Sequence, residues 1–268
     1  SPIYKIDDKI LQKAKKLKAI LTPSTGVTHL DNEYLERKKI NVISIKKHPM
    51  LKNIKASSEF TFGLVFDSLR NLSLGTQSSK NGYWRQQEDR LRGSQLYEKK
   101  LGIVGYGRIG SNVAKYAKSF GMKCLANDPH KKKYLVSKGM YANLDRLIKT
   151  SDVILISVHL NASTKNLVNK TFFRKMNKNA ILVNTSRGEV VDEKALLNVL
   201  KNKLIKSAYL DVITNEQQSD LSNHPLIEYS KKNNNLTITP HMAGLTFESE
   251  NIAAEIVINL LENVEKKN

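Results

Sequence analysis

The stretch LGIVGYGRIGSNVAKYAKSFG, residues 101–121, decides the fold of this chain. Its first residues predict a buried strand, glycines follow in the spacing Gly105-x-Gly107-x-x-Gly110, and a helical pattern begins at the third glycine. Gly105 allows a tight turn, Gly107 lets the backbone approach a pyrophosphate, and Gly110 lets the helix pack on the strand. Free N–H groups at the helix N-terminus attract phosphates. The stretch therefore predicts a dinucleotide-binding strand–turn–helix unit.

The next strand signal, MKCLAN, ends in an acid, Asp128. A carboxylate at this distance from the glycines can accept hydrogen bonds from both ribose hydroxyls of NAD and would repel the 2′-phosphate of NADP. His130 and Lys131–Lys133 follow at once and could soften that preference. NAD is the predicted cofactor, and the alternative is a Rossmann-like domain with a different ligand or none.

Strand and helix signals alternate regularly after this point. Strands are expected at 101–105, 122–127, 152–158, 180–184, 206–211 and 236–239, and helices at 108–120, 144–149, 171–176, 192–201 and 246–264. Weaker signals come earlier: a helix at 7–17, strands at 18–21 and 40–45, and a long helix at 57–74. This rhythm predicts an α/β protein with a doubly wound parallel sheet.

Two Rossmann-like lobes are expected. Residues 71–244 would form the NAD-binding domain. Residues 1–70 would form a smaller, flavodoxin-like substrate lobe, completed by the C-terminal helix 245–268. Because the chain opens on a helix that feeds a strand, this lobe is expected to be N-terminally incomplete.

Bulk composition narrows the class of protein. Hydrophobic residues make up 40%, the mean hydropathy is −0.41, and the longest clean apolar run is VILISV, 153–158, far below membrane-spanning length. A single cysteine, Cys124, and a polar N-terminus without a secretory signal predict a cytoplasmic protein. The formal charge of +19 could indicate a nucleic-acid partner. The lysines are scattered and no aromatic-interleaved basic strands accompany them, which argues against a nucleic-acid partner.

Polar residues follow three of the expected strands: Asn184, Thr185 and Arg187; Asp211; and His241. In open parallel sheets, ligands bind at the carboxyl ends of the strands. Arg187 could hold a substrate carboxylate, or it could pair structurally with Glu189 or Asp192. His241 could exchange the proton that accompanies hydride transfer, and Glu216 beside it would stabilise the imidazolium. Each of these residues alone could have a purely structural role. Together, beside a dinucleotide site, they favour a catalytic role.

The chain resembles the D-isomer-specific 2-hydroxyacid dehydrogenases, in particular their phosphoglycerate dehydrogenase-like members. The resemblance runs nearly end to end. It rests on ILTPSTGVTHLD (20–31), SSEFTFGLVFDSLRN (57–71), the segment 96–129, AILVNTSRGEVVDEKAL (180–196), the Asp211 to Glu216 loop and TPHMAG (239–244). NTSRG, an acid in the next loop and then TPHxAG form the specific part of the match.

The resemblance implies roles for particular residues. Arg187 would anchor the substrate, His241 would be the acid/base, and Glu216 would pair with it. Backbone N–H groups of the turn Ser24, Thr25, Gly26 and Val27 would bind the substrate carboxylate. Cofactor contacts would come from Gly105, Gly107, Arg108, Ile109, Gly110, Asp128, Thr185, Asp211 and Gly244. The partners implied are a small 2-hydroxy or 2-oxo acid and a second copy of the chain, docked through an arm around Trp84.

The chain departs from the family pattern in three places. The family pattern has a further N-terminal strand–helix unit, which the given sequence does not contain. The stretch between Glu216 and His241 is longer than expected. Thr22-Pro23 stands where phosphoglycerate-specific members carry an arginine. The predicted function is NAD-dependent interconversion of a D-2-hydroxy acid and its 2-oxo acid, with 3-phosphoglycerate as one candidate substrate. The alternative is an NAD(H)-sensing partner-binding protein of co-repressor type without turnover.

Overall fold

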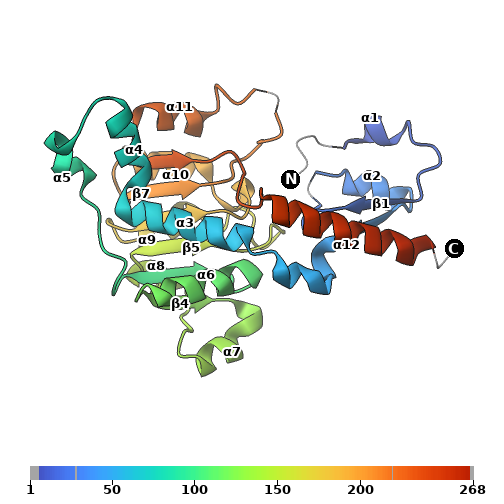
Figure 1. The fold of residues 1–268 in the computed structure, drawn as a ribbon, viewed down its shortest axis with the longest axis horizontal. Helices are drawn as coiled ribbons and strands as arrows, with labels where there is room; N and C mark the ends of the chain where they lie inside the picture. Colours follow the sequence, from blue (N-terminus) through green and yellow to red (C-terminus); the bar gives the residue numbers. More distant parts are fainter. Residues whose placement is uncertain (1–5, 28, 219, 266–268) are drawn as a thin grey trace. The chain divides into compact units, whose positions relative to one another are not determined.

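A computed structural model describes residues 6–27, 29–218 and 220–265 of the chain (Figure 1). The chain divides into two compact units, Ser1–Ala56 together with Gly244–Asn268, and Ser57–Ala243. Each unit has its own sheet and its own hydrophobic core.

The larger unit is built on a six-stranded, entirely parallel sheet in the order β4-β3-β5-β6-β7-β8. The strands are β3 (Lys100–Val104), β4 (Lys123–Asn127), β5 (Val153–Ile156), β6 (Ile181–Asn184), β7 (Ser207–Leu210) and β8 (Leu236–Ile238). The chain first winds from β3 to β4 and then returns to place β5 on the other side of β3. This order confirms the doubly wound sheet and puts its switch point between β3 and β5, where such sheets bind ligands.

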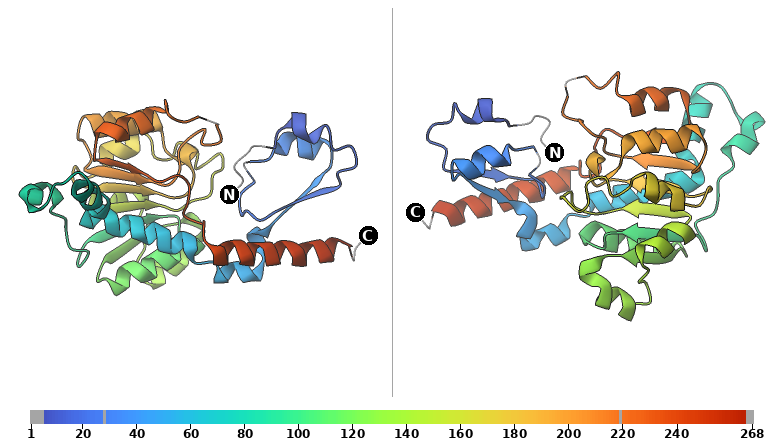
Figure 2. Two further views of the ribbon diagram at one scale, coloured as in Figure 1. Left: turned by 45° about the horizontal axis from the view of Figure 1, so that its top comes forward. Right: turned by 180° about the vertical axis from the view of Figure 1, so that it is seen from behind.

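Helices cover both faces of this sheet, as the three views in Figures 1 and 2 show. One face packs against α8 (Leu144–Thr150), α9 (Lys170–Lys175), α10 (Glu193–Lys201) and α11 (Pro225–Lys232). The other face packs against α6 (Arg108–Ser119) and α3 (Ala56–Arg70). Every residue of β5, β6 and β7 is buried, which explains why these strands are nearly continuous apolar runs.

Helix α3 belongs to the larger unit, so the division of the chain lies at Ala56/Ser57 and differs from the expected 70/71. Leu64, Val65 and Leu69 of α3 pack in one cluster with Leu101 and Ile103 of β3. The crossovers after β5 place their helices on the opposite face, so α6 and α3 together cover this one. Without α3, apolar residues of the central strands would face water.

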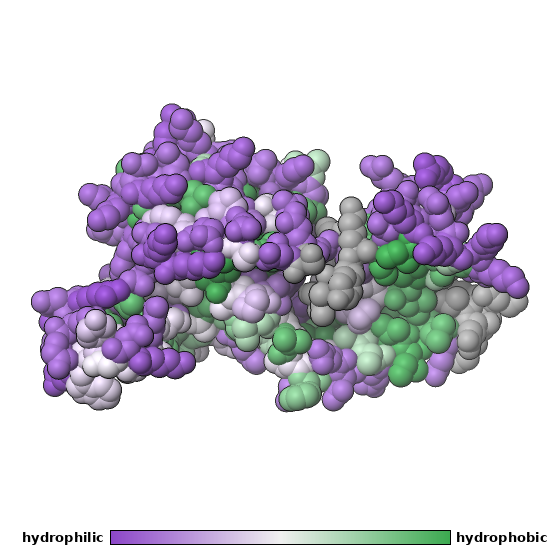
Figure 3. Space-filling view, turned by 90° about the horizontal axis from the view of Figure 1, so that it is seen from above, coloured by the Kyte–Doolittle hydropathy of each residue, from purple (hydrophilic) through white to green (hydrophobic). Residues whose placement is uncertain are grey.

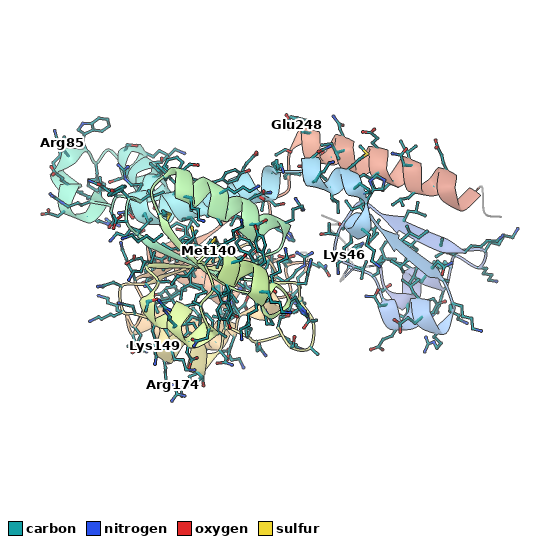
Figure 4. The ribbon with its side chains drawn as sticks, turned by 90° about the horizontal axis from the view of Figure 1, so that it is seen from below. Lys46, Arg85, Met140, Lys149, Arg174 and Glu248 are labelled. Atoms are coloured by element: carbon teal, nitrogen blue, oxygen red, sulfur yellow. The ribbon has the colours of Figure 1, made fainter. Side chains whose placement is uncertain are left out.

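The long helix expected at 57–74 is interrupted. Asn71 has a left-handed backbone, φ 55°, between α3 and α4 (Leu72–Lys80). The side chain of Asp67, buried in α3, accepts a hydrogen bond from the Ser73 backbone N–H at 2.9 Å and so stabilises the start of α4. After α4 come η3 (Arg85–Gln87) and α5 (Glu88–Leu91), where a polar connector was expected. Arg85, labelled in Figure 4, lies at the outer end of this arm.

Two further helices were not expected from the sequence. They are α7 (Lys132–Ser137), preceded by η4 (Pro129–Lys131), and α11, which occupies the long stretch between Glu216 and His241. Pro225 lies at the first turn of α11, and the His224 side chain accepts from the Leu226 N–H. Proline at this position is compatible with helix initiation.

The smaller unit pairs β1 (Ala19–Thr22) with β2 (Asn41–Ser44) in parallel, with α2 (Asn32–Arg37) between them. Ile256 and Ala253 of α12 (Phe247–Glu265) pack against apolar residues of η1 (Ile45–Lys47) and η2 (Pro49–Asn53). The helix expected at 7–17 is wrong in length, because α1 spans only Asp8–Leu11 and turns follow. The end of the expected C-terminal helix, 266–268, lies outside the described residues.

Surface residues of the larger unit are mostly hydrophilic on the face seen in Figure 3. Lys149 of α8 and Arg174 of α9 lie at its periphery in Figure 4. Within the described ranges, no helix is both long and apolar enough to cross a membrane.

Candidate active site

The glycine turn after β3 is shaped by two close contacts within the protein. Gly105 has φ +92°, and a Cβ there would lie 2.3 Å from the Ser157 carbonyl oxygen at the end of β5. A Cβ on Gly110 would lie 2.4 Å from the Gly105 carbonyl oxygen and 3.1 Å from Ile103. The turn and the packing of α6 on β3 therefore require glycine at both positions, as predicted.

Gly107, in contrast, is not required by the protein itself. Its φ is −75°, and a Cβ there would meet no atom within 4 Å. It caps α6 without a side-chain bond, so the helix N-terminus opens onto this space. The residues present thus fit a dinucleotide, whose pyrophosphate would occupy the space beside the helix N-terminus.

Arg108 and Ile109 begin α6. Burial lowers the pKa of Arg108, although the guanidinium remains charged at any ordinary pH. Ile109 packs on the core behind the turn. A half-buried cation at a phosphate-binding helix terminus adds to the attraction for an anion.

Asp128 directly follows β4 and is held from two sides. Its Oδ2 accepts from the Tyr106 backbone N–H at 2.9 Å, and its Oδ1 accepts from the His130 N–H at 3.0 Å. The acid is thereby tied to the glycine turn while staying partly exposed. Carboxylate oxygens accept more than one hydrogen bond, so ribose hydroxyls remain compatible with this arrangement.

The turn after β6 presents Arg187. Asn184, fully buried, accepts from the Ser186 N–H and hydroxyl and donates to the Arg187 carbonyl at 3.0 Å. The guanidinium donates to the Ser186 carbonyl at 2.7 Å. Across the described part of the chain, no carboxylate forms an ion pair with Arg187. Asp192, one of the two structural partners considered, instead caps α10 through Ala195.

Glu216 and His241 meet directly. The Glu216 Oε1 lies 2.6 Å from the His241 Nδ1, and both side chains are about one quarter exposed. A carboxylate can only accept, so Nδ1 carries a proton and donates it. In neutral His241 the Nε2 is therefore the nitrogen without a proton. The predicted pair is present, and the loop at Asn215, φ +57°, turns Glu216 toward it.

Asp211 holds the loop that carries His241. Its Oδ1 accepts from the Thr239 hydroxyl at 2.6 Å and the Met242 N–H at 3.0 Å, and its Oδ2 accepts from the Ala243 N–H at 2.9 Å. Burial raises the pKa of Asp211, and these hydrogen bonds oppose that effect. The sequence suggested a cofactor contact here; the structure adds a role in orienting the loop.

Thr185 follows Asn184 and contacts a residue that sequence reasoning missed. Its hydroxyl lies 2.7 Å from the hydroxyl of Thr61, a fully buried residue of α3 that also donates to the Ser57 carbonyl. No local sequence signal marks Thr61, because its partner lies on a distant strand end.

The remaining predicted residues lie in the smaller unit. Ser24–Val27 follow β1, and the Ser24 N–H donates to the Thr22 hydroxyl at 3.3 Å. Gly244 comes directly after Ala243 and accepts from the Thr246 N–H. Their contacts with substrate and cofactor stay predictions. In the residues that the structure describes, no group of three or more histidine, cysteine or acidic side chains could hold a metal ion.

Residues 62–243 match the family described as D-isomer specific 2-hydroxyacid dehydrogenase, NAD binding domain. The chain belongs to the D-isomer-specific 2-hydroxyacid dehydrogenase family. This family model describes an NAD-binding domain, so the predicted cofactor, NAD, and the predicted α/β fold with a doubly wound parallel sheet are confirmed.

Named relatives agree with this assignment. The chain is 35% identical over 263 residues to D-3-phosphoglycerate dehydrogenase of Methanocaldococcus jannaschii, covering 97% of this chain but only 48% of that protein. It therefore spans about half the length of this relative. The D-lactate dehydrogenase of Aquifex aeolicus, solved with NAD and lactic acid, is 31% identical with a TM-score of 0.84, over 98% of this chain and 80% of that one. The NAD complex of Staphylococcus aureus formate dehydrogenase has 27% identity and a TM-score of 0.85, over 98% and 77%.

Proposed function

We propose that this dehydrogenase interconverts a small D-2-hydroxy acid and its 2-oxo acid. The single observation that carries the proposal is the contact between Glu216 and His241, which engages Nδ1, so that Nε2 would be the proton-exchanging atom. Bound NAD would accept or supply the hydride in this reaction. The other roles fall to side chains of the chain itself.

His241 would handle the hydroxyl proton. During reduction, the imidazolium would donate from Nε2 to the oxygen that becomes the hydroxyl, and during oxidation Nε2 would accept that proton. Glu216 would stabilise the imidazolium and keep the ring in one orientation. The Glu216 carboxylate can only accept a hydrogen bond, so Nδ1 of His241 is the donor in this contact. This supports an orienting role for Glu216 and the proton exchange by His241.

Arg187 would hold the acid. A guanidinium fork matches a carboxylate and can also polarise the neighbouring 2-oxo group. The absence of an ion pair between Arg187 and any carboxylate of the described residues supports a ligand role.

A homodimer formed through the arm is part of the proposal. Trp84 and Tyr83 are exposed on the arm and line a hollow of about 390 Å³ with Leu91. Exposed aromatic residues around a hollow are common at interfaces. Sedimentation velocity on the protein and on Trp84→Ser tests it: a dimer that the substitution weakens is expected, and a monomeric parent contradicts it. The cytoplasmic location stays a prediction.

A panel of 2-oxo acids tests the function. Oxidation of NADH is followed by absorbance with pyruvate, hydroxypyruvate, glyoxylate and 3-phosphohydroxypyruvate. At least one is expected to be reduced, and 3-phosphohydroxypyruvate decides the phosphoglycerate assignment. If NADH binds but none is reduced, the sensing alternative is favoured over the dehydrogenase.

A further inference from the structure

The loop between β7 and Glu216 is clamped by a carboxylate outside the proposed catalytic set. Glu193, in the first turn of α10, accepts from the Thr214 backbone N–H at 2.7 Å through Oε1 and from the Thr214 hydroxyl at 2.6 Å through Oε2. Its side chain is 16% exposed, so these bonds are largely shielded from water. Thr214 lies two positions before Glu216 on the same short loop.

The same loop is pressed from another side by the turn that carries Arg187. A Cβ on Gly188 would lie 2.1 Å from the Ile213 carbonyl carbon and 2.4 Å from the Thr214 nitrogen. Ile213 itself is buried in the core under α10. The backbone before Thr214 is thus fixed by packing, and Thr214 is fixed by Glu193.

A third residue completes the surroundings of Glu193. His224 accepts from the Leu226 N–H through Nδ1 at 3.3 Å, which places the proton of the neutral ring on Nε2. That Nε2 lies 3.4 Å from Glu193 Oε2. The three groups that the described residues bring to the carboxylate are therefore all donors: the Thr214 N–H, the Thr214 hydroxyl and the His224 ring.

We propose that Glu193 and Thr214 are positioning residues that hold Glu216 against His241. The inference rests on the proposed function of that pair. Only Asn215 separates Thr214 from Glu216, so a loop released from Glu193 would let the Glu216 carboxylate move. A displacement of about 1 Å in a catalytic group can reduce a rate on the order of a hundredfold.

Thr214→Val removes the hydroxyl and keeps a similar side-chain volume, whereas Thr214→Ser keeps the hydroxyl. Glu193→Ala removes both carboxylate acceptors. Lys194→Ala, at the exposed neighbouring position on α10, is the matched control. We expect Thr214→Val to lower kcat about tenfold and Glu193→Ala to lower it further. NADH affinity, followed by fluorescence, should stay unchanged, and the serine and Lys194 variants should behave like the parent.

A double-mutant cycle separates positioning from general damage. In a Glu216→Ala background, Thr214→Val is expected to have no further effect on kcat, because the side chain that it positions is gone. The same loss in both backgrounds overturns the inference, as does parental kcat in Thr214→Val or in Glu193→Ala.

A spectroscopic readout keeps the test independent of turnover. In ¹⁵N-histidine spectra, the neutral His241 should be the Nδ1-protonated tautomer in the parent and in Thr214→Ser, and a mixture in Thr214→Val. If no 2-oxo acid is turned over, the proposed function fails while these spectra still decide the positioning. An unchanged tautomer in Thr214→Val overturns it.

Discussion

Glu216 Oε1 lies 2.6 Å from His241 Nδ1, although the two residues are 25 positions apart. Their contact does not result from nearness along the sequence. Glu216 comes from the loop after β7, and His241 follows β8, with its own φ of +50°. Because the carboxylate can only accept, the contact places the proton of the neutral ring on Nδ1.

Removing either member of this pair should slow turnover by different amounts. His241→Asn is expected to lower kcat by about a factor of a thousand, since it removes the proton donor. Glu216→Gln should lower it less, because the ring remains and only its partner is neutral. Both variants should bind NADH with parental affinity in a fluorescence titration. Near-parental turnover of His241→Asn would contradict the acid/base role.

Replacing Arg187 should separate acid binding from cofactor binding. Arg187→Ala is expected to lower kcat/KM for the 2-oxo acid by roughly a thousandfold, because a charge-assisted bidentate contact is lost. Arg187→Lys should restore only part of it, since an ammonium lacks the planar fork. NADH titrations should be unchanged for both. Parallel loss of NADH binding would place Arg187 in the cofactor site instead.

The glycines of the turn form a matched pair. Gly105→Ala should destabilise the protein by several kcal/mol, because its Cβ would lie 2.3 Å from the Ser157 carbonyl at φ +92°. Gly107→Ala should change the free energy of unfolding by less than about 1 kcal/mol, as its Cβ meets open space. Its NADH affinity should nevertheless fall. Urea unfolding and NADH titration check both variants. An unchanged NADH affinity of Gly107→Ala would contradict pyrophosphate binding at this turn.

Cys124 predicts a stability loss at alkaline pH. Burial raises the pKa of its thiol from 9.0 to about 11. The folded protein thus keeps a proton that the unfolded chain releases, so the stability is intact below pH 9 and falls as pH rises toward 11. The loss should be about 2 kcal/mol over that window. Urea unfolding at pH 8 and pH 10.5 should show a smaller fall for Cys124→Ala; an equal fall would contradict the raised pKa.

Much of the larger unit could be predicted from the sequence. The central strands β5 and β6 are buried on both faces, which gives short apolar runs bounded by turn residues. The glycine turn could be predicted because it directly follows such a run. The strand-end residues Arg187, Asp211 and His241 could be predicted as site residues because parallel strands place their carboxyl ends at one edge of the sheet. Helices α7 and α11 were missed because short helices begin at caps such as His224 rather than with a long apolar period.

By itself, the sequence determined the alternation of strands and helices, the dinucleotide turn and the identity of the polar strand ends, because these depend on local periodicity and on backbone sterics. Only the tertiary structure decided that α3 covers the larger sheet, that Asp211 is occupied by the Thr239–Ala243 loop, and that Glu193 clamps Thr214. These relationships join residues far apart in the chain. They arise from packing two faces of a sheet and from satisfying buried polar groups, and no local pattern encodes which partner will be near.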